Sequence, residues 1–389
     1  MKHLLLITTS YPDQRPGSEA AGSFVADFAE ALSRYLRVSV VAPAGETSSL
    51  CQGNLHLHRF AVPFLPLSLL SLREPRHWPR IIGTLRAGKK AVEALARQEK
   101  IDHILALWAL PSGSWARSIG KKYQIPYSVW ALGSDIWSLS RIPVVNMVLR
   151  TVLRESRLSF ADGYLLQRDV EKLTGRPCAF LPSTRRLPLS GLRQFAQGPP
   201  YRLAFLGRWH HHKGTDLLCA ALGALTDEDW GKIAEVRICG GGPLEGEVQE
   251  LCTGLREAGR PVTAGGYLDK EGAAELLSWA DYLLIPSRIE SIPVVFSDAL
   301  QARCPVIAMP VGDLPRLLEE WPIGVLAEEV TPAAYARAIR AALRKAPLSY
   351  AGDLEKAVLT FDVEKAAESF LQMAGFASSE VRGDFIRVR

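Results

Sequence analysis

Residues 281–310 constrain the fold of this chain more than any other stretch, because they alternate between strand and helix patterns. Residues 282–285 (YLLI) form a short apolar run, as in a strand buried in a parallel sheet. A polar turn follows over residues 287–293, then a helix pattern over 294–301 and a further strand that starts at residue 305. In an open α/β sheet, ligands bind outside the carboxyl ends of strands and near helix N-termini. The turn is therefore where we expect a phosphate-bearing ligand.

The N-terminal half opens with the same alternation. A strand is predicted over residues 4–9, a glycine-containing loop over 13–22, a helix over 23–35 and a second strand over 38–41. Such a βαβ unit favours a doubly wound sheet. The loop ends at a helix N-terminus, so Gly22 is a candidate for the close approach of a phosphate, although any tight loop of this kind needs glycine.

The second half repeats the pattern, and its predicted strands end at glycines. In chain order they are residues 201–205 before Gly207-Arg208, 236–239 before Gly240-Gly241-Gly242-Pro243, and 261–264 before Gly265-Gly266-Tyr267. Residues 187–200, rich in proline and glycine, are typical of a linker. The sequence therefore predicts an α/β protein of two domains, residues 1–186 and 201–363.

Size and composition agree with two soluble domains. The chain has 389 residues, of which 48% are apolar and 22% charged. Its six cysteines are scattered without a C-x-x-C pair, which indicates free thiols in a reducing compartment and neither a disulfide framework nor a zinc site. No apolar run is long enough to span a bilayer, and the first apolar residues are better explained as a strand than as a signal peptide. We therefore expect a cytoplasmic protein.

Charge is unevenly distributed along the chain. Residues 1–190 hold 25 Lys and Arg against 14 Asp and Glu, whereas the remainder holds 21 against 27. Residues 60–90 combine an apolar, proline-containing run with Arg, Lys and Trp, which is typical of an interfacial contact with an anionic membrane. The alternative is a proline-broken loop that leads into an ordinary amphipathic helix. A nucleic-acid partner is not expected, because the aromatic stacking pattern of such proteins is missing.

Several motifs occur in one order between residues 207 and 312. They are Gly207-Arg208 with Lys213-Gly214, the glycine turns at 240–243 and 265–267, residues 286–291 (PSRIES), residues 305–308 (PVIA) and Gly312. This series resembles the C-terminal donor domain of the retaining glycosyltransferases of family 4, which have the GT-B fold. The family's E-x7-E signature is represented by Glu290 and Asp298.

The N-terminal half is similar to the acceptor domain of that family through shorter motifs. They are the opening βαβ unit, residues 110–113 (LPSG), residues 133–135 (GSD) and Ala161-Asp162. The resemblance implies two Rossmann-like β/α/β domains that face a central cleft. Residues 1–186 would bind the acceptor and 201–363 the nucleotide sugar, and a last helix at about 364–378 would pack back on the first domain.

The resemblance also implies a donor site without metal or cofactor. Arg208 and Lys213 would neutralise the diphosphate as the glycosidic bond breaks. Glu290 would hydrogen-bond the sugar and Asp298 the ribose. The remaining predicted donor-binding residues are Gly22, Gly207, Gly241, Gly242, Tyr267, Arg288, Ser291, Ile292, Pro293 and Val294. The alternatives are solvated surface charge for the two cations and a helix-start carboxylate for each acid.

This chain departs from the family pattern at several positions. Leu107 and Leu132 stand where the family often has histidine, Asp298 is one methylene shorter than glutamate, and Arg303, Asp313 and Arg316 replace a common Gly, Gly and Glu. With no histidine near the reacting sugar, Asp135 becomes the candidate for acceptor orientation or proton handling. The resemblance implies front-face attack by the acceptor hydroxyl while the departing phosphate oxygen helps to remove its proton.

Two tempting metal motifs are discounted. Residues 227–229 (DED) have the form of a D-x-D motif, but they fit a solvated acidic turn, and three adjacent histidines at 210–212 cannot all face one ion on a regular element. A Rossmann dehydrogenase would need G-x-G-x-x-G after the first strand, where this chain has GSEAAGS. Two hypotheses remain, namely an active hexosyltransferase that uses a UDP- or GDP-sugar and a glycan or lipid-linked acceptor, and a catalytically weak homologue that binds nucleotide sugars or glycans as a scaffold subunit.

Overall fold

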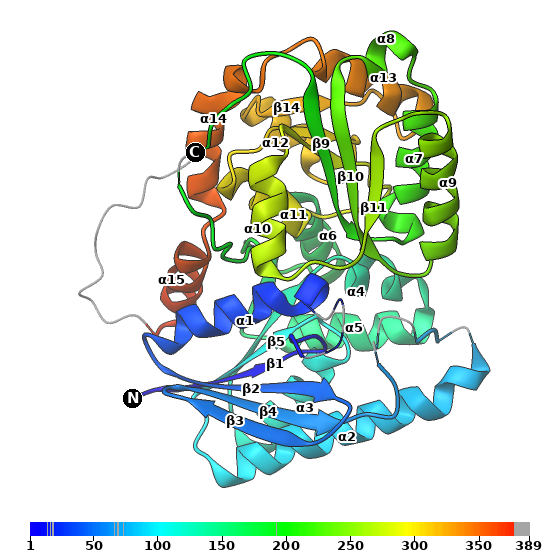
Figure 1. Cartoon of the computed structure of the whole chain (residues 1–389). Helices are drawn as coiled ribbons and strands as arrows, with labels where there is room; N and C mark the ends of the chain where they lie inside the picture. The colour runs from blue at the N-terminus through cyan, green and yellow to red at the C-terminus, as the bar shows by residue number, and fades with distance from the viewer. Residues whose placement is uncertain are drawn as a thin grey trace.

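The computed structural model describes residues 1–13, 15, 17, 19–65, 67, 70–72, 74–191 and 193–376. They form two β/α domains, one above the other in Figure 1. Parts of four predicted segments lie outside the described residues, namely the loop 13–22, the basic and apolar segment 60–90, the linker 187–200 and the predicted last helix 364–378. Within the described ranges, no helix is both long and apolar enough to cross a membrane.

The N-terminal domain is built on a sheet with the strand order β3-β4-β2-β1-β5-β6-β7-β8, in which only β3 runs antiparallel to its neighbour. The bounds are β1 (His3–Ile7), β2 (Arg37–Ala44), β3 (Ser48–Gln52), β4 (Leu55–Ala61), β5 (His103–Leu107), β6 (Tyr127–Ala131), β7 (Leu158–Ala161) and β8 (Ala179–Phe180). Since β1 is buried on both faces, its residues 4–7 are apolar without alternation. The β3–β4 hairpin was not predicted from the sequence.

Helices cover both faces of this sheet (Figure 1). Phe28 of α1 packs on one face, and Val92 of α2, Ile119 of α3 and Val152 of α5 pack on the other. The bounds are α1 (Glu19–Ser33), α2 (Trp78–Gln98), α3 (Ser112–Tyr123), α4 (Ser134–Trp137), α5 (Pro143–Glu155) and α6 (Tyr164–Thr174), with short 3₁₀ turns η2 (Pro75–His77) and η3 (Leu139–Arg141).

One predicted strand is too long. The sequence suggests a strand from residue 159 to 166, but β7 ends at Ala161 and α6 begins at Tyr164. Leu166 and Val170, four residues apart, are both buried by the helix, so the apolar run after Gly163 belongs to the helical pattern.

The C-terminal domain has an all-parallel sheet with the order β11-β10-β9-β12-β13-β14. Its strands are β9 (Tyr201–Arg208), β10 (Ile233–Gly241), β11 (Val262–Gly265), β12 (Tyr282–Ile285), β13 (Val306–Ala308) and β14 (Gly324–Leu326). Its helices are α7 (Thr215–Gly223), α8 (Asp227–Trp230), α9 (Glu245–Glu257), α10 (Lys270–Trp279), α11 (Val294–Gln301), α12 (Leu314–Glu320), α13 (Pro332–Ala342) and α14 (Ala351–Ala357), with 3₁₀ turns η4 (His211–Lys213), η5 (Pro347–Tyr350) and η6 (Val358–Thr360). The strand and helix predicted at 282–285 and 294–301 are confirmed as β12 and α11.

The end of the described chain crosses from one domain to the other. Phe361 packs against Phe296 of the C-terminal domain, with ring centroids 5.6 Å apart. Phe370 of the following helix, α15 (Val363–Ala374), packs against Phe28 of α1 at 6.0 Å, and α15 lies beside α1 in Figure 1. The last helix is therefore part of the N-terminal core.

A buried ion pair also joins the two domains. Arg185, which follows β8, donates from Nε and Nη2 to the carboxylate of Asp298 in α11, with Nη2 2.7 Å from Oδ2. The side chains are 8% and 1% exposed. Nη1 of Arg185 donates to Ser23 Oγ at 3.2 Å, so one guanidinium contacts both domains. Removal of one partner would leave a charge buried in a medium of low dielectric constant.

We expect Arg185→Met to lower the free energy of unfolding by roughly 3–5 kcal/mol, because the Asp298 carboxylate would remain buried without its partner. The double variant Arg185→Met/Asp298→Leu should recover much of that loss. Urea denaturation followed by tryptophan fluorescence measures both. Arg337→Met, which removes an exposed pair with Glu328, is the control and should change stability by less than about 1 kcal/mol. A double variant as unstable as the single one would contradict this explanation.

Candidate functional site

The turn after β12 meets the loop after β9 at the carboxyl edge of the C-terminal sheet. Lys213 Nζ and Ser287 Oγ both donate to Oε1 of Glu290, at 2.6 and 2.7 Å. The Glu290 side chain is 10% exposed and that of Lys213 is 35% exposed. Two of the predicted catalytic side chains, far apart in sequence, are thus in direct contact at the place where a ligand of an open α/β sheet binds.

Glycine makes this contact between loops possible. Gly214 has a φ of +67°, and a Cβ there would lie 2.0 Å from the carbonyl oxygen of Pro286. The main-chain N–H of Arg288 donates to the carbonyl of His212 at 2.8 Å. The loop that carries Lys213 therefore lies directly against the turn that carries Glu290.

Arg288 holds the turn to the start of α7. Its Nη1 and Nη2 donate to the two carboxylate oxygens of Asp216, each at 2.7 Å, and Nη1 also donates to the carbonyl of His211 at 2.9 Å. Asp216 was not identified from the sequence, although its place in the first turn of a helix, three residues after Lys213, was a usable signal. The predicted donor contact of Arg288 stays a prediction.

The glycine turns of β9 and β10 form the next part of the edge. A Cβ on Gly240 would lie 1.8 Å from the carbonyl oxygen of Gly207, so these strand ends touch. Tyr267 Oη donates to the carbonyl of Gly241 at 2.6 Å, and a Cβ on Gly241 would meet the tyrosine ring at 2.7 Å. A Cβ on Gly17 of the N-terminal domain would meet the same ring at 2.7 Å. The first loop of the chain therefore reaches the turns that we expect to frame the base.

The other predicted donor residues occupy definite places. Arg208 ends β9, Gly242 packs against the main chain of Trp209, and Gly22 packs against the main chain of Tyr11. Ile292 is buried, Pro293 is the N-cap residue of α11, and Val294 contacts the core of the N-terminal domain. Their contacts with a donor stay predictions.

Asp135 organises the N-terminal edge from inside the protein. Its side chain is buried, Oδ2 accepts the N–H of Ala109 at 2.6 Å and Oδ1 accepts that of Leu132 at 3.2 Å. Burial raises the pKa of Asp135 to about 6, and these main-chain donors act against that rise. Each carboxylate oxygen of Asp135 thus has a main-chain partner, and together they join the ends of β5 and β6, while its predicted role toward an acceptor stays untested.

Asp162, at the end of the neighbouring strand β7, is the carboxyl group that meets the other domain. Ser183 Oγ donates to its Oδ2 at 3.1 Å, while Oδ1 has no hydrogen-bond partner of regular geometry. Burial raises the pKa of Asp162 to about 7; the nearby hydroxyl of Ser291 acts against that rise, and the charges of Asp135 and Glu290 add to it. From the sequence, we identified Asp162 only as part of the Ala161-Asp162 motif.

Asp298, which we predicted to contact the ribose, lies in a more enclosed place than Glu290. Both its oxygens accept hydrogen bonds from Arg185, and its side chain is 1% exposed. Burial raises the pKa of Asp298, although Arg185 acts in the opposite direction. Glu290 therefore lies beside the loop that carries Lys213, whereas Asp298 lies inside the domain interface.

The two discounted motifs have local structural roles. Asp227–Trp230 form α8, with a capping box between Thr226 and Asp229, and Asp229 also pairs with Arg340 at 2.7 Å. His210 Nδ1 accepts the N–H of His212 at 3.2 Å in the loop before Lys213. Among the described residues, no group of three or more His, Cys, Asp or Glu side chains is arranged to hold a metal ion.

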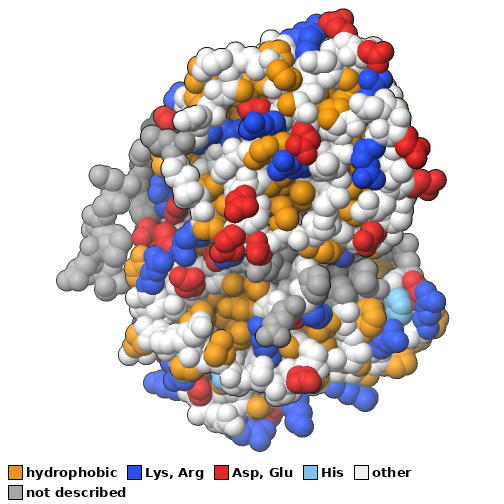
Figure 2. Space-filling model, in the orientation of Figure 1, with side chains coloured by type: hydrophobic (Ala, Val, Ile, Leu, Met, Phe, Trp, Pro, Cys, Tyr) orange, Lys and Arg blue, Asp and Glu red, His pale blue; other side chains and the backbone are white. Residues whose placement is uncertain are grey.

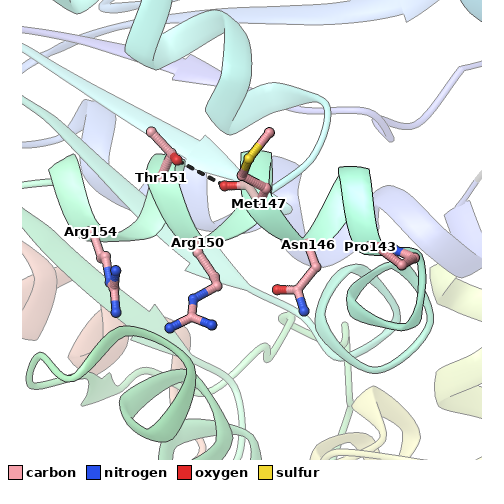
Figure 3. Close-up of a pocket in the computed structure, with 6 residues that line it drawn as sticks. All are labelled: Pro143, Asn146, Met147, Arg150, Thr151 and Arg154. Carbon is pink, nitrogen blue, oxygen red and sulfur yellow. Dashed lines mark hydrogen bonds between the residues drawn. The ribbon is translucent and has the colours of Figure 1, made fainter.

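A shallow groove of about 430 Å³ lies elsewhere, along α5. Asn146, Arg150 and Arg154 point to one side of the helix, and Met147 and Thr151 point to the other (Figure 3). Pro143 completes the lining. The groove contains none of the predicted site residues, so it is a separate surface feature of the N-terminal domain.

Comparison with solved structures identifies the class of fold. Sucrose-phosphate synthase (tll1590) from Thermosynechococcus elongatus superimposes with a TM-score of 0.77 at 18% identity, over 96% of this chain and 98% of that one. Anabaena Alr3699/HepE in complex with UDP-glucose gives a TM-score of 0.69 at 15% identity, over 97% and 100%. The chain thus has the GT-B fold of these proteins.

Sequence comparison adds a family match. Residues 200–345 match the family described as Glycosyl transferases group 1. D-inositol 3-phosphate glycosyltransferase of Corynebacterium glutamicum (strain R) is 32% identical over 140 residues, which are 35% of this chain and 34% of that protein. The putative teichuronic acid biosynthesis glycosyltransferase TuaC of Bacillus subtilis (strain 168) is 28% identical over 56% of this chain and 55% of that protein. The aligned part of the chain spans about a third to a half of the length of these curated relatives.

The surroundings of Asp162 predict a pH dependence of stability. The folded protein holds a proton on this group up to about pH 7, whereas the unfolded chain releases it near pH 4, so the contribution of Asp162 to stability falls as pH rises between these values. The midpoint of thermal unfolding of Asp162→Asn, relative to the unsubstituted protein, should therefore rise between about pH 4 and pH 7.

Two features make this comparison specific to Asp162. Asp135 also has a raised pKa but is present in both proteins, so it cancels in the difference. Asp353→Asn, at a partly exposed site of α14, is the control. A pH-independent difference between Asp162→Asn and the unsubstituted protein would show that Asp162 is ionised in the folded state.

Proposed function

We propose that this protein is a retaining, metal-independent glycosyltransferase of family 4 that works in the cytoplasm. It moves a hexose from a UDP- or GDP-sugar to a glycan or lipid-linked acceptor in the synthesis of polysaccharide or cell envelope. The observation that carries the proposal is the contact of Lys213 with Glu290 at the carboxyl edge of a domain that matches the group 1 family. No cofactor takes part besides the nucleotide sugar, which is the substrate.

The donor would lie along the glycine turns. Arg208 and Lys213 face the diphosphate, where their charge stabilises the phosphate that leaves. Glu290 accepts hydrogen bonds from sugar hydroxyls, and Tyr267 frames the base. The solved complexes of Alr3699/HepE contain UDP and UDP-glucose, which supports a UDP-sugar as the donor of this chain as well.

Transfer requires no protein nucleophile in this scheme. The bond between the anomeric carbon and the diphosphate oxygen breaks, and a bond from that carbon to the acceptor oxygen forms on the same face. The acceptor proton passes to the departing phosphate oxygen. Lys213 and Arg208 balance the negative charge that develops there, and Glu290 holds the sugar in position.

An acceptor at a membrane surface is supported by the exposed face of α2. Trp78, Ile82 and Leu85 are 51%, 45% and 40% exposed and recur at positions i, i+4 and i+7, so they form one apolar stripe. Lys and Arg side chains gather along the lower edge of the N-terminal domain in Figure 2, where α2 runs in Figure 1. Apolar and basic groups together suit the anionic surface of a bilayer.

A scaffold subunit that binds nucleotide sugars or glycans without turnover is the second candidate. The enclosure of Asp298 by Arg185 favours it, because that carboxylate already has its partner. The first candidate must bind a donor and transfer its sugar, whereas the second binds a nucleotide sugar or a glycan and transfers nothing.

We expect one class of UDP-, GDP- or ADP-sugar to raise the thermal midpoint of the protein by several degrees through preferential binding to the folded state. Glu290→Gln and Lys213→Met should each lower transfer or donor hydrolysis by about a hundredfold or more. Lys232→Met, which breaks an exposed pair with Glu228, is the matched control and should leave activity unchanged.

The outcomes separate the two candidates. Donor binding without turnover over a broad set of acceptors would favour the scaffold subunit. The absence of a thermal shift with every nucleotide sugar would overturn the transferase and leave only a scaffold that binds glycans.

We expect binding to anionic vesicles, measured by cosedimentation, to fall at least about tenfold when Arg76, Arg80 and Arg86 are changed to Glu. The same reversal at Lys232, Arg337 and Lys356 of the C-terminal domain alters the net charge equally and is the control. Equal losses in the two triple variants would show that attraction is general and that α2 is no specific contact.

A further inference from the structure

The N-terminus of α6 is capped from the opposite domain. Its own N-cap residue is Gly163, which has no side chain to accept a hydrogen bond. Instead, the carboxylate of Asp313 accepts the N–H of Leu165, with Oδ1 at 3.1 Å and Oδ2 at 3.3 Å. A carboxylate at this position satisfies an orphan donor and interacts favourably with the helix dipole.

The two domains touch at this cap without space for a side chain. A Cβ on Gly163 would lie 2.2 Å from Ser291 Oγ and 2.5 Å from Asp313 Oδ2. The guanidinium of Arg316 lies 3.8 Å from the centroid of the Tyr164 ring. The contact therefore consists of a cap, a cation on an aromatic ring and the side chains of Ser291 and Asp313 packed against the main chain of Gly163.

Asp313 also supports the turn that carries Glu290. The main-chain N–H of Asp313 donates to the carbonyl of Ser291 at 3.2 Å. The preceding Gly312 has a φ of +56°, and a Cβ there would lie 2.3 Å from the carbonyl oxygen of Glu290 and 2.4 Å from that of Ser291. One residue thus holds the turn through its main chain and the other domain through its side chain.

We propose that Asp313 is a positioning residue that couples closure of the two domains to the placement of Glu290. Through its cap on α6, it sets the distance between the sugar-binding turn and the acceptor domain. Arg316 strengthens the same contact by its position on Tyr164. This inference rests on the proposed glycosyltransferase function, since it assigns to Asp313 a role in the same reaction.

The proposal predicts a separation between turnover and donor binding. Asp313→Ala removes the cap and should lower kcat by about five- to thirtyfold, which corresponds to the usual stabilisation by an N-cap. The affinity for UDP, measured by calorimetry, should stay within about twofold, because Lys213 and the glycine turns belong to the C-terminal domain alone.

A conservative variant tests the cap itself. Asp313→Asn keeps an oxygen that accepts the N–H of Leu165 and should retain kcat within about threefold. Arg316→Gln should lower kcat in the same direction as Asp313→Ala but less, and it leaves the cap in place. Asp229→Ala, which removes a capping side chain of α8 inside the C-terminal domain, controls for general destabilisation.

Small-angle X-ray scattering of the full chain supplies a readout that does not need activity. Asp313→Ala should increase the radius of gyration, whereas Asp313→Asn and Asp229→Ala should not. An unchanged radius in Asp313→Ala, a kcat of Asp313→Asn as low as that of Asp313→Ala, or a UDP affinity that falls in step with kcat would each overturn the proposal. If the unsubstituted protein transfers and hydrolyses no donor, the proposed function fails, while the scattering comparison still decides whether Asp313 holds the domains together.

Discussion

A charge buried in a protein needs its partner, and the pair of Arg185 and Asp298 therefore determines where the two domains of this chain meet. Both side chains are almost fully buried, and Arg185 also reaches Ser23 at the start of the first helix. If the domains moved apart at this point, the ions would separate in a medium where separation is costly. The side chain of Asp298 is thus almost inaccessible to solvent, whereas that of Lys213, in the candidate site, is 35% exposed.

At the edges of the sheets, glycines allow close contacts because they have no side chain. Gly214, Gly240 and Gly163 each lie where a Cβ would come within about 2 Å of an oxygen atom of a neighbouring segment. Loops that follow different strands consequently touch at these glycines, through main-chain atoms at Gly214 and Gly240 and through the Ser291 side chain at Gly163. Such contacts bring Lys213 to Glu290 and the end of β7 to Ser291, so the site depends as much on missing side chains as on charged ones.

Much of this arrangement is accessible from sequence, and the limit has a physical cause. Strand and helix patterns around residues 282–301 depend on local periodicity, and they predicted β12 and α11 correctly. The boundary of β7 was wrong, because Tyr164-Leu165-Leu166 is an apolar run that fits strand and helix equally well. The partners of Asp298, Asp135 and Asp162 were not predictable, since each depends on which segment folds against the carboxylate.

Two of the departures from the family pattern share one location, the interface between the domains. Asp298 and Asp313 stand far apart in sequence, yet each places its carboxylate against a group of the N-terminal half, one on Arg185 and the other on the N-terminus of α6. Each of these carboxylates already accepts hydrogen bonds from the other half of the protein, so fewer of its lone pairs are free for a ligand hydroxyl. The acids of this chain are therefore divided by position: Glu290 faces the loop of Lys213, and Asp298 and Asp313 hold the two halves around it.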